Sequence, residues 1–154
     1  MSTRERKPLR DLLIRTDGGT SFSNDRTRIL REILSALRRH PIVTEASPHP
    51  PSTFTEVRAT LAPHRWGHDI DSATLRVTWQ PIDPPEFAFH YSDDGFDCGW
   101  HQEPNPHVDG ESHYQERYTG DSDQYEPIQS DGETASELVW EIMDRLKNRL
   151  DQRK

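Results

Sequence analysis

The clearest pattern in the chain is a pair of apolar stripes with helical spacing, one near each end. In the first, apolar residues recur every three or four positions over Asp25–Arg39, which predicts an amphipathic helix. Ser23 or Asn24 is the expected N-cap, because a short side-chain oxygen accepts hydrogen bonds from first-turn amides. Pro41 is the expected stop. The upstream segment Leu9–Ile14 is compatible with either a short helix or a strand.

The second stripe runs from Leu138 to Leu150 and predicts a C-terminal helix. Thr134 and Glu137 match a capping box at its start, in which the threonine caps the glutamate amide and the glutamate reaches back. Trp140 lies off the stripe, so we expect it to cover a neighbouring element or to contact a partner chain.

Between the helices, apolar and polar residues alternate with the two-residue period of β-strands. Asp94-Gly95 predicts a tight hairpin between the last two clear segments, because glycine accepts the positive φ that such turns need. A fifth, weaker strand is expected around Tyr114–Tyr118, whereas Pro48–Pro51 predicts a stiff connection and Thr119–Ser130 a polar loop. The apolar faces of the four clear segments are Val57/Ala59/Leu61, Leu75/Val77/Trp79, Phe87/Phe89/Tyr91 and Phe96/Cys98/Trp100.

This order of elements predicts an α+β fold. We expect an antiparallel sheet of four or five strands, flanked by an N-terminal and a C-terminal helix. A chain of 154 residues is about one domain long. The expected domain covers residues 23–150, after a basic and candidate flexible N-terminal segment (1–22) and before a frayed tail (151–154).

The composition is acidic and poor in lysine. Asp and Glu number 27 against 19 Lys and Arg, and the lysines are Lys7, Lys147 and Lys154. Such a balance is typical of halophilic proteins, whose acidic surfaces stay hydrated where salt at 1 M screens charge within about 3 Å. The alternative is an ordinary acidic protein from a GC-rich genome.

Positive charge is concentrated in the first 40 residues. They carry 10 Lys or Arg against 5 acidic residues, a net charge of +5, which leaves −13 for the remainder. This asymmetry indicates an end that contacts nucleic acid or an acidic partner, or a basic flank that folds back on the chain's own acidic surface.

The single cysteine, Cys98, excludes an intramolecular disulfide framework and a cysteine-built zinc site. Its place in an alternating segment predicts a small core residue. No apolar run approaches the roughly 18–20 residues that cross a membrane. Met1–Arg10 lacks the apolar stretch of a secretory signal, so we expect a cytoplasmic protein with no membrane partner.

Polar and aromatic side chains are densest between residues 89 and 115. Successive pieces are His90-Tyr91, the Asp94-Gly95 turn, a strand ending at Trp100, Asn105-Pro106-His107 and His113-Tyr114-Gln115. Over roughly residues 74–146 this order resembles the TumE-like toxins of prokaryotic toxin–antitoxin pairs. The resemblance implies a toxin-like component that acts on RNA or translation and is held in check by a cognate antitoxin.

Histidines supply the candidate chemistry of this stretch. His101, His107 and His113 are the expected catalytic residues, because neutral imidazoles can act as acid and base in RNA cleavage. Glu103 can orient one of them or act as the base. The sequence leaves open whether the chain is an enzyme. If it is one, we expect a ribonuclease-like activity. The expected RNA-binding residues are Arg76, Arg117, His90, Tyr91, Trp100 and Asn105.

Other interpretations stay open. One is that the histidines and asparagine of this proline-rich stretch have no functional role and only make local hydrogen bonds. The chain can be a non-catalytic interaction module, either a homodimer through Trp140 or a sheet edge, or a component that binds a different partner. It can also be a small metal-dependent hydrolase with zinc on His101, His107 and His113. Their spacing matches neither a helix nor a strand, so we expect no metal and no cofactor.

Overall fold

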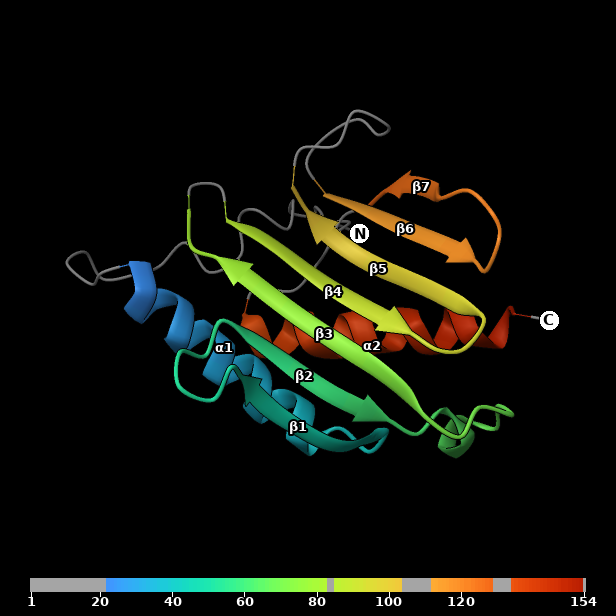
Figure 1. The fold of residues 1–154 in the computed structure, drawn as a ribbon, viewed down its shortest axis with the longest axis horizontal. Coiled ribbons are helices and arrows are strands. Elements are labelled where there is room, and N and C mark those ends of the chain that lie inside the picture. The colour runs from blue at the N-terminus through green and yellow to red at the C-terminus, as the bar shows by residue number, and fades with distance from the viewer. Residues whose placement is uncertain (1–21, 83–84, 104–111, 129–133, 154) are drawn as a thin grey trace, which may run out of the picture.

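The computed structural model describes residues 22–82, 85–103, 112–128 and 134–153. These residues form one seven-stranded antiparallel sheet, in which each strand pairs with its neighbours in sequence (Figure 1). Two long helices contact each other and pack on one face, which leaves the other face without a long helix in the described part of the chain. The elements are α1 (Phe22–Arg39), β1 (Val43–His49), β2 (Glu56–Leu61), the 3-10 helix η2 (Pro63–Trp66), β3 (Ala73–Gln80), β4 (Glu86–Ser92), β5 (Phe96–Gln102), β6 (Ser112–Tyr118), β7 (Gln124–Pro127) and α2 (Ala135–Asp151).

The α+β class and the two flanking helices are confirmed, but the number of strands is not. The sheet has seven strands instead of four or five, and the two additional strands, β1 and β7, form its edges. β1 ends at His49, inside the expected stiff connection (Pro48–Pro51), and β7 lies within the expected polar loop (Thr119–Ser130). An edge strand pairs on one side only and tolerates proline and polar residues, so neither segment shows clear alternation.

The helix ends agree with the sequence pattern at one helix and differ at the other. The hydroxyl of Thr134 accepts a hydrogen bond from the Glu137 amide at 3.1 Å, as expected for the start of α2. Helix α1 spans Phe22–Arg39, so its described part starts before Ser23 and Asn24, the residues expected to precede the first turn. Among the described residues, no helix combines the length and apolar character that a membrane span requires.

The turn between β4 and β5 also differs in detail from the prediction. The Asp93 amide donates to the Phe96 carbonyl at 3.0 Å, which closes the expected hairpin. Gly95 does not have a positive φ there. Instead, its amide donates to the Asp93 carboxylate at 3.1 Å, so an aspartate side chain stabilises the turn.

The core lies between the helices and the covered face of the sheet. Aromatic residues dominate it, and the rings of the cross-strand neighbours Trp79 and Phe87 stack with centroids 4.9 Å apart. Trp100 and Tyr114, paired across β5 and β6, lie 5.0 Å apart. Such pairs add about 0.5–1.5 kcal/mol each beyond the burial of their area. The stripe of α2 that packs on these rings is Ala135, Leu138, Val139, Ile142, Met143, Leu146 and Leu150.

The strand register aligns the side chains of the open face into rows that cross the sheet. Because side chains alternate along a strand, every residue paired with an open-face residue also faces away from the helices. One row is Ser47, Arg58, Arg76, His90, Gly99, Gln115 and Tyr125. The adjacent row is His49, Glu56, Thr78, Ala88, His101, His113 and Pro127.

Candidate functional site

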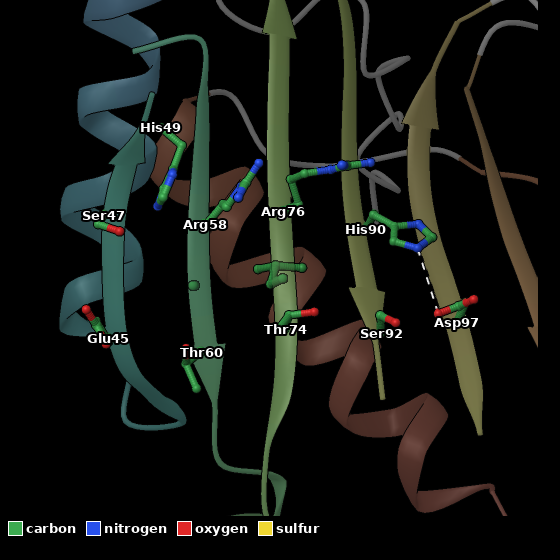
Figure 2. Close-up of a pocket in the computed structure, with 12 residues that line it drawn as sticks. Glu45, Ser47, His49, Arg58, Thr60, Thr74, Arg76, His90, Ser92 and Asp97 are labelled. Atoms are coloured by element: carbon green, nitrogen blue, oxygen red, sulfur yellow. Dashed lines mark ion pairs between the residues drawn. The ribbon is translucent and has the colours of Figure 1, made fainter. Parts of the chain in front are cut away.

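The open face holds a shallow polar concavity of about 610 Å³ over strands β1 to β5 (Figure 2). Its walls combine guanidinium, imidazole, hydroxyl and carboxylate groups, which offer hydrogen bonds of both senses. The lining residues are Glu45, Ser47, His49, Arg58, Ala59, Thr60, Thr74, Leu75, Arg76, His90, Ser92 and Asp97.

Two arginines lie side by side in this concavity and share one carboxylate. Nη2 of Arg58 lies 2.9 Å from Oε1 of Glu56, and Nε of Arg76 lies 3.5 Å from Oε2 of the same residue. The arginine side chains are 55% and 59% exposed, whereas Glu56 is 16% exposed. A guanidinium has five N–H donors, so most donors of both residues are left for water or a ligand.

His90 closes the other side of the concavity and faces Asp97 (Figure 2). Its Nε2 lies 3.9 Å from Oδ1 of Asp97, and Nη2 of Arg117 lies 3.6 Å from the other carboxylate oxygen. Burial lowers the pKa of His90 by more than the charge of Asp97 raises it. The imidazole is therefore neutral near pH 7, able to donate one hydrogen bond and accept another.

A second polar group lies in the adjacent row, where His101 on β5 pairs with His113 on β6. Their rings stack at 5.0 Å with an interplanar angle of 24°. Oε1 of Glu103, directly after β5, lies 3.3 Å from Nδ1 of His101. One ligand atom from each of the three residues lies within 4.8 Å of the others, which is a spacing that can hold a metal ion.

Gly99 makes room for this group. A Cβ atom at Gly99 would lie 2.5 Å from Nε2 of His101 and 3.0 Å from the Phe89 carbonyl oxygen. A Cβ atom at this position would force the His101 ring to move, so the absence of a side chain at Gly99 allows the ring to lie over the strand. Among the described residues, Nε2 of His101 is buried and has no hydrogen-bond partner.

The structure brings together part of the predicted site. His101, Glu103 and His113 cluster, as the hypothesis of converging imidazoles requires. Arg76 and His90 line the concavity, and Arg117 reaches it through Asp97. Asn105 and His107 lie outside the described residues.

Tyr91 and Trp100 lie elsewhere, and the expectation that they contact RNA needs correction. They are 0% and 2% exposed and face the helices, where Tyr91 donates a hydrogen bond to Asp93 at 2.7 Å. Strand alternation explains this, because Tyr91 follows open-face His90 and Trp100 precedes open-face His101. Cys98 is buried on the same side, and burial raises the pKa of its thiol to about 12, which suits a core residue and not a nucleophile.

The sequence interpretation missed Arg58 and His49. Arg58 pairs directly with Arg76 across β2 and β3, so the register of those two strands was the signal that could have identified it. His49 lies on β1, a strand that the pattern did not predict, and its place in the site could not have been found without that edge.

Comparison with known proteins identifies no relative of this chain. No protein-family model, curated protein or solved structure matches the chain.

Proposed function

We propose that the open face of the sheet binds RNA, and that the chain acts through this contact as the toxin-like component of a toxin–antitoxin pair. The observation that supports RNA binding is the Arg58–Arg76 pair on an open polar face, with one carboxylate between two guanidiniums. Phosphate contacts dominate the affinity of proteins for nucleic acids, and arginine is well suited to make them.

The surroundings of the arginine pair fit a phosphodiester ligand. Hydroxyl groups of Ser47, Thr60 and Thr74 line the same concavity and can donate to phosphate or ribose oxygens. Neutral His90 can donate to one oxygen while accepting from a ribose 2′-hydroxyl, a group that DNA lacks. These groups supply positioning contacts and no obvious platform for reading bases, so we expect weak sequence preference.

The overall acidity limits the expected strength of binding. The chain carries a net charge of −8, so long-range attraction to RNA is absent and affinity depends on the local arginine pair. An acidic surface of this kind also suits a cognate antitoxin with a basic segment. The antitoxin can therefore bind either apart from the RNA or at an overlapping position. A competition experiment distinguishes the two cases.

The test is fluorescence anisotropy with a labelled single-stranded RNA, in chelator-containing buffer, for the wild type and the Arg58→Gln/Arg76→Gln double variant. Removing two phosphate contacts is expected to weaken binding by about 10-fold or more at low salt. It should also reduce the slope of log affinity against log salt by about 0.7 for each lost contact.

The matched control is Arg28→Gln/Arg31→Gln, which makes the same charge change at exposed positions of α1, on the covered side of the sheet. Equal weakening in both double variants would mean that net charge alone governs binding, and it would overturn the proposal. In a bacterial host, induction of the wild type should arrest growth, and only the open-face variant should relieve the arrest.

A second candidate, a protein-interaction module, is favoured by Trp140. Its side chain is 41% exposed on α2 and lies 4.6 Å from the His40 ring. Tryptophan is enriched at the energetic centres of interfaces. If light scattering gives a dimer that becomes monomeric in Trp140→Ala while RNA binding is absent, this function replaces the first.

A further inference from the structure

We infer that His101, Glu103 and His113 form a binding site for a divalent transition-metal ion, with zinc as the best fit. The three residues come from the paired strands β5 and β6 and from the residue that follows β5. The inference does not depend on RNA binding, because it rests on a different group of side chains.

The distances between the ligand atoms match the size of a zinc coordination sphere. Zinc bonds to histidine nitrogen and carboxylate oxygen are about 2.0–2.2 Å long, so two ligands of a tetrahedral ion lie about 3.3 Å apart. Nδ1 of His101 and Oε1 of Glu103 are 3.3 Å apart. All three ligand atoms lie within 4.8 Å of one another, so the ligands must close by at most about 1.5 Å, within the reach of side-chain rotation.

The strand pair holds the two imidazoles in place before any ion arrives. His113 is 0% exposed and the His101 side chain is 15% exposed, and their rings are stacked on neighbouring strands. Because Gly99 lets Nε2 of His101 rest against the backbone, Nδ1 is the nitrogen directed at Glu103. Ligands on paired strands lose little freedom on binding, since their backbone is already fixed.

Glu103 supplies the negative charge of the site. Its side chain is 48% exposed, so the carboxylate group can turn toward an ion at small cost. Two neutral imidazoles and one carboxylate are the donor set of many catalytic zinc sites, in which the fourth position stays open. That position would take water or a phosphate oxygen.

Isothermal titration of the chelator-treated full chain with Zn²⁺ alone tests the site. We expect one ion per chain for the wild type. In His101→Gln the affinity should fall by more than about 100-fold, because loss of a direct ligand exceeds the roughly 10–100-fold loss seen for outer-shell partners. Co²⁺ in place of Zn²⁺ should give visible absorption typical of a tetrahedral ion, and this signal should vanish in the variant.

Two controls separate the site from adventitious binding and from misfolding. His49→Gln removes a histidine on the same face of the sheet but at its far edge, on β1, and should leave the affinity for Zn²⁺ unchanged. Glu103→Gln changes an exposed side chain that the core does not need, so it should fold normally and still lose about 10-fold or more in affinity. Wild-type affinity in both Glu103→Gln and His101→Gln, or no stoichiometric binding by the wild type, would overturn the inference.

The RNA proposal and the metal site can fail separately. RNA binding is measured in chelator, where no ion occupies the site, and zinc binding is measured without RNA. Loss of one result leaves the other unaffected.

Discussion

The two faces of the sheet come from the same strands but differ in what their side chains can do. On the covered face, Trp79, Phe89 and Trp100 are at most 2% exposed and pack against α1 and α2. On the open face of the same three strands, Arg76 is 59% exposed and His90 is 38% exposed. Strand alternation assigns neighbouring residues to opposite faces, so Phe89 and His90 differ in environment although they are adjacent in sequence.

The covered face therefore provides stability, and the open face provides the groups that can bind a ligand. Buried aromatic rings stabilise the fold through the apolar area that they bury and through close packing. A change in the shape of one ring therefore disturbs packing throughout the core. Open-face groups contribute little to folding because water can replace their contacts. The open face is therefore free to carry charges and imidazoles that suit a ligand, and substitutions of its exposed side chains report on binding with little disturbance of the fold.

The largest effect is expected when the two faces of β4 are compared directly. Phe89→Ala removes a fully buried ring and should lower the free energy of unfolding by about 3–5 kcal/mol. His90→Ala, one residue away on the open face, should change it by less than about 1 kcal/mol. Urea denaturation followed by tryptophan fluorescence measures both. Similar losses in the two variants would contradict the division between the faces.

A smaller effect is expected at the end of β4, where a buried ion pair joins the sheet to the chain after α2. Nη2 of Arg153 lies 3.2 Å from the Asp93 carboxylate, whose side chain is only 3% exposed. Asp93→Asn leaves the guanidinium without its charged partner and should cost about 2–4 kcal/mol, measured by urea denaturation at pH 7. The matched control Asp94→Asn, at the next position, should cost less than about 0.5 kcal/mol.

The same pair predicts a dependence of stability on pH. Burial alone would raise the pKa of Asp93, but hydrogen bonds from Arg153, Tyr91 and the Gly95 amide outweigh it and hold the pKa below its usual value. The stabilisation is therefore complete at neutral pH and is lost as the pH falls below about 4, through the lower pKa of the folded chain. Asp93→Asn should show a smaller loss over this range than the wild type.

Much of the fold was predictable because the covered face imposes a two-residue period on the central strands. β2 to β5 alternate clearly, since each has one face in the core, and the stripes of α1 and α2 follow from the same burial. β1 and β7 were not predicted, because an edge strand needs few apolar residues to stay paired. Pro48 within β1 and Pro127 at the end of β7 also argued against strands at the level of sequence.

The candidate site was less predictable, because it depends on register. The convergence of His101 and His113 follows from the pairing of β5 with β6, which places them opposite each other. The sequence analysis grouped His101 and His113 with His107 and Glu103 in one candidate site, but it could not give their relative positions, and its zinc alternative named His107 in place of Glu103. Arg58 was missed for the same reason, since only its pairing with Arg76 brings it into the concavity.

A further prediction concerns the close contacts at Gly99. Gly99→Ala places a methyl group against His101 and the Phe89 carbonyl, so the imidazole must move and the strand must adjust. We expect a loss of about 1–2 kcal/mol in unfolding free energy, as for other overpacked sites, together with displacement of His101 seen by NMR. Gly95→Ala is the control, because its added methyl would lie 3.6 Å from Arg153, an ordinary contact. Equal behaviour of the two variants would mean that Gly99 does not position His101.

The smallest effect separates two histidines on opposite sides of the sheet. His40, after α1, is 5% exposed, lies 4.6 Å from the Trp140 ring, and accepts a hydrogen bond from the Ile42 amide through Nδ1. Burial lowers its pKa by more than Asp144 raises it. The folded chain therefore favours neutral His40, and protonation below about pH 6.5 favours unfolding.

His90 has a lowered pKa from the same cause, but its greater exposure lets water stabilise the charged form at less cost to the fold. We expect the wild type to lose on the order of 1 kcal/mol or less of stability between pH 7.5 and 5 through His40. His40→Gln should remove most of this pH dependence, whereas His90→Gln should remove little of it. Urea denaturation at several pH values measures the difference. If His90→Gln flattens the profile more than His40→Gln, the open face would contribute to folding as strongly as the covered side, and its side chains could not be interpreted as reserved for a ligand.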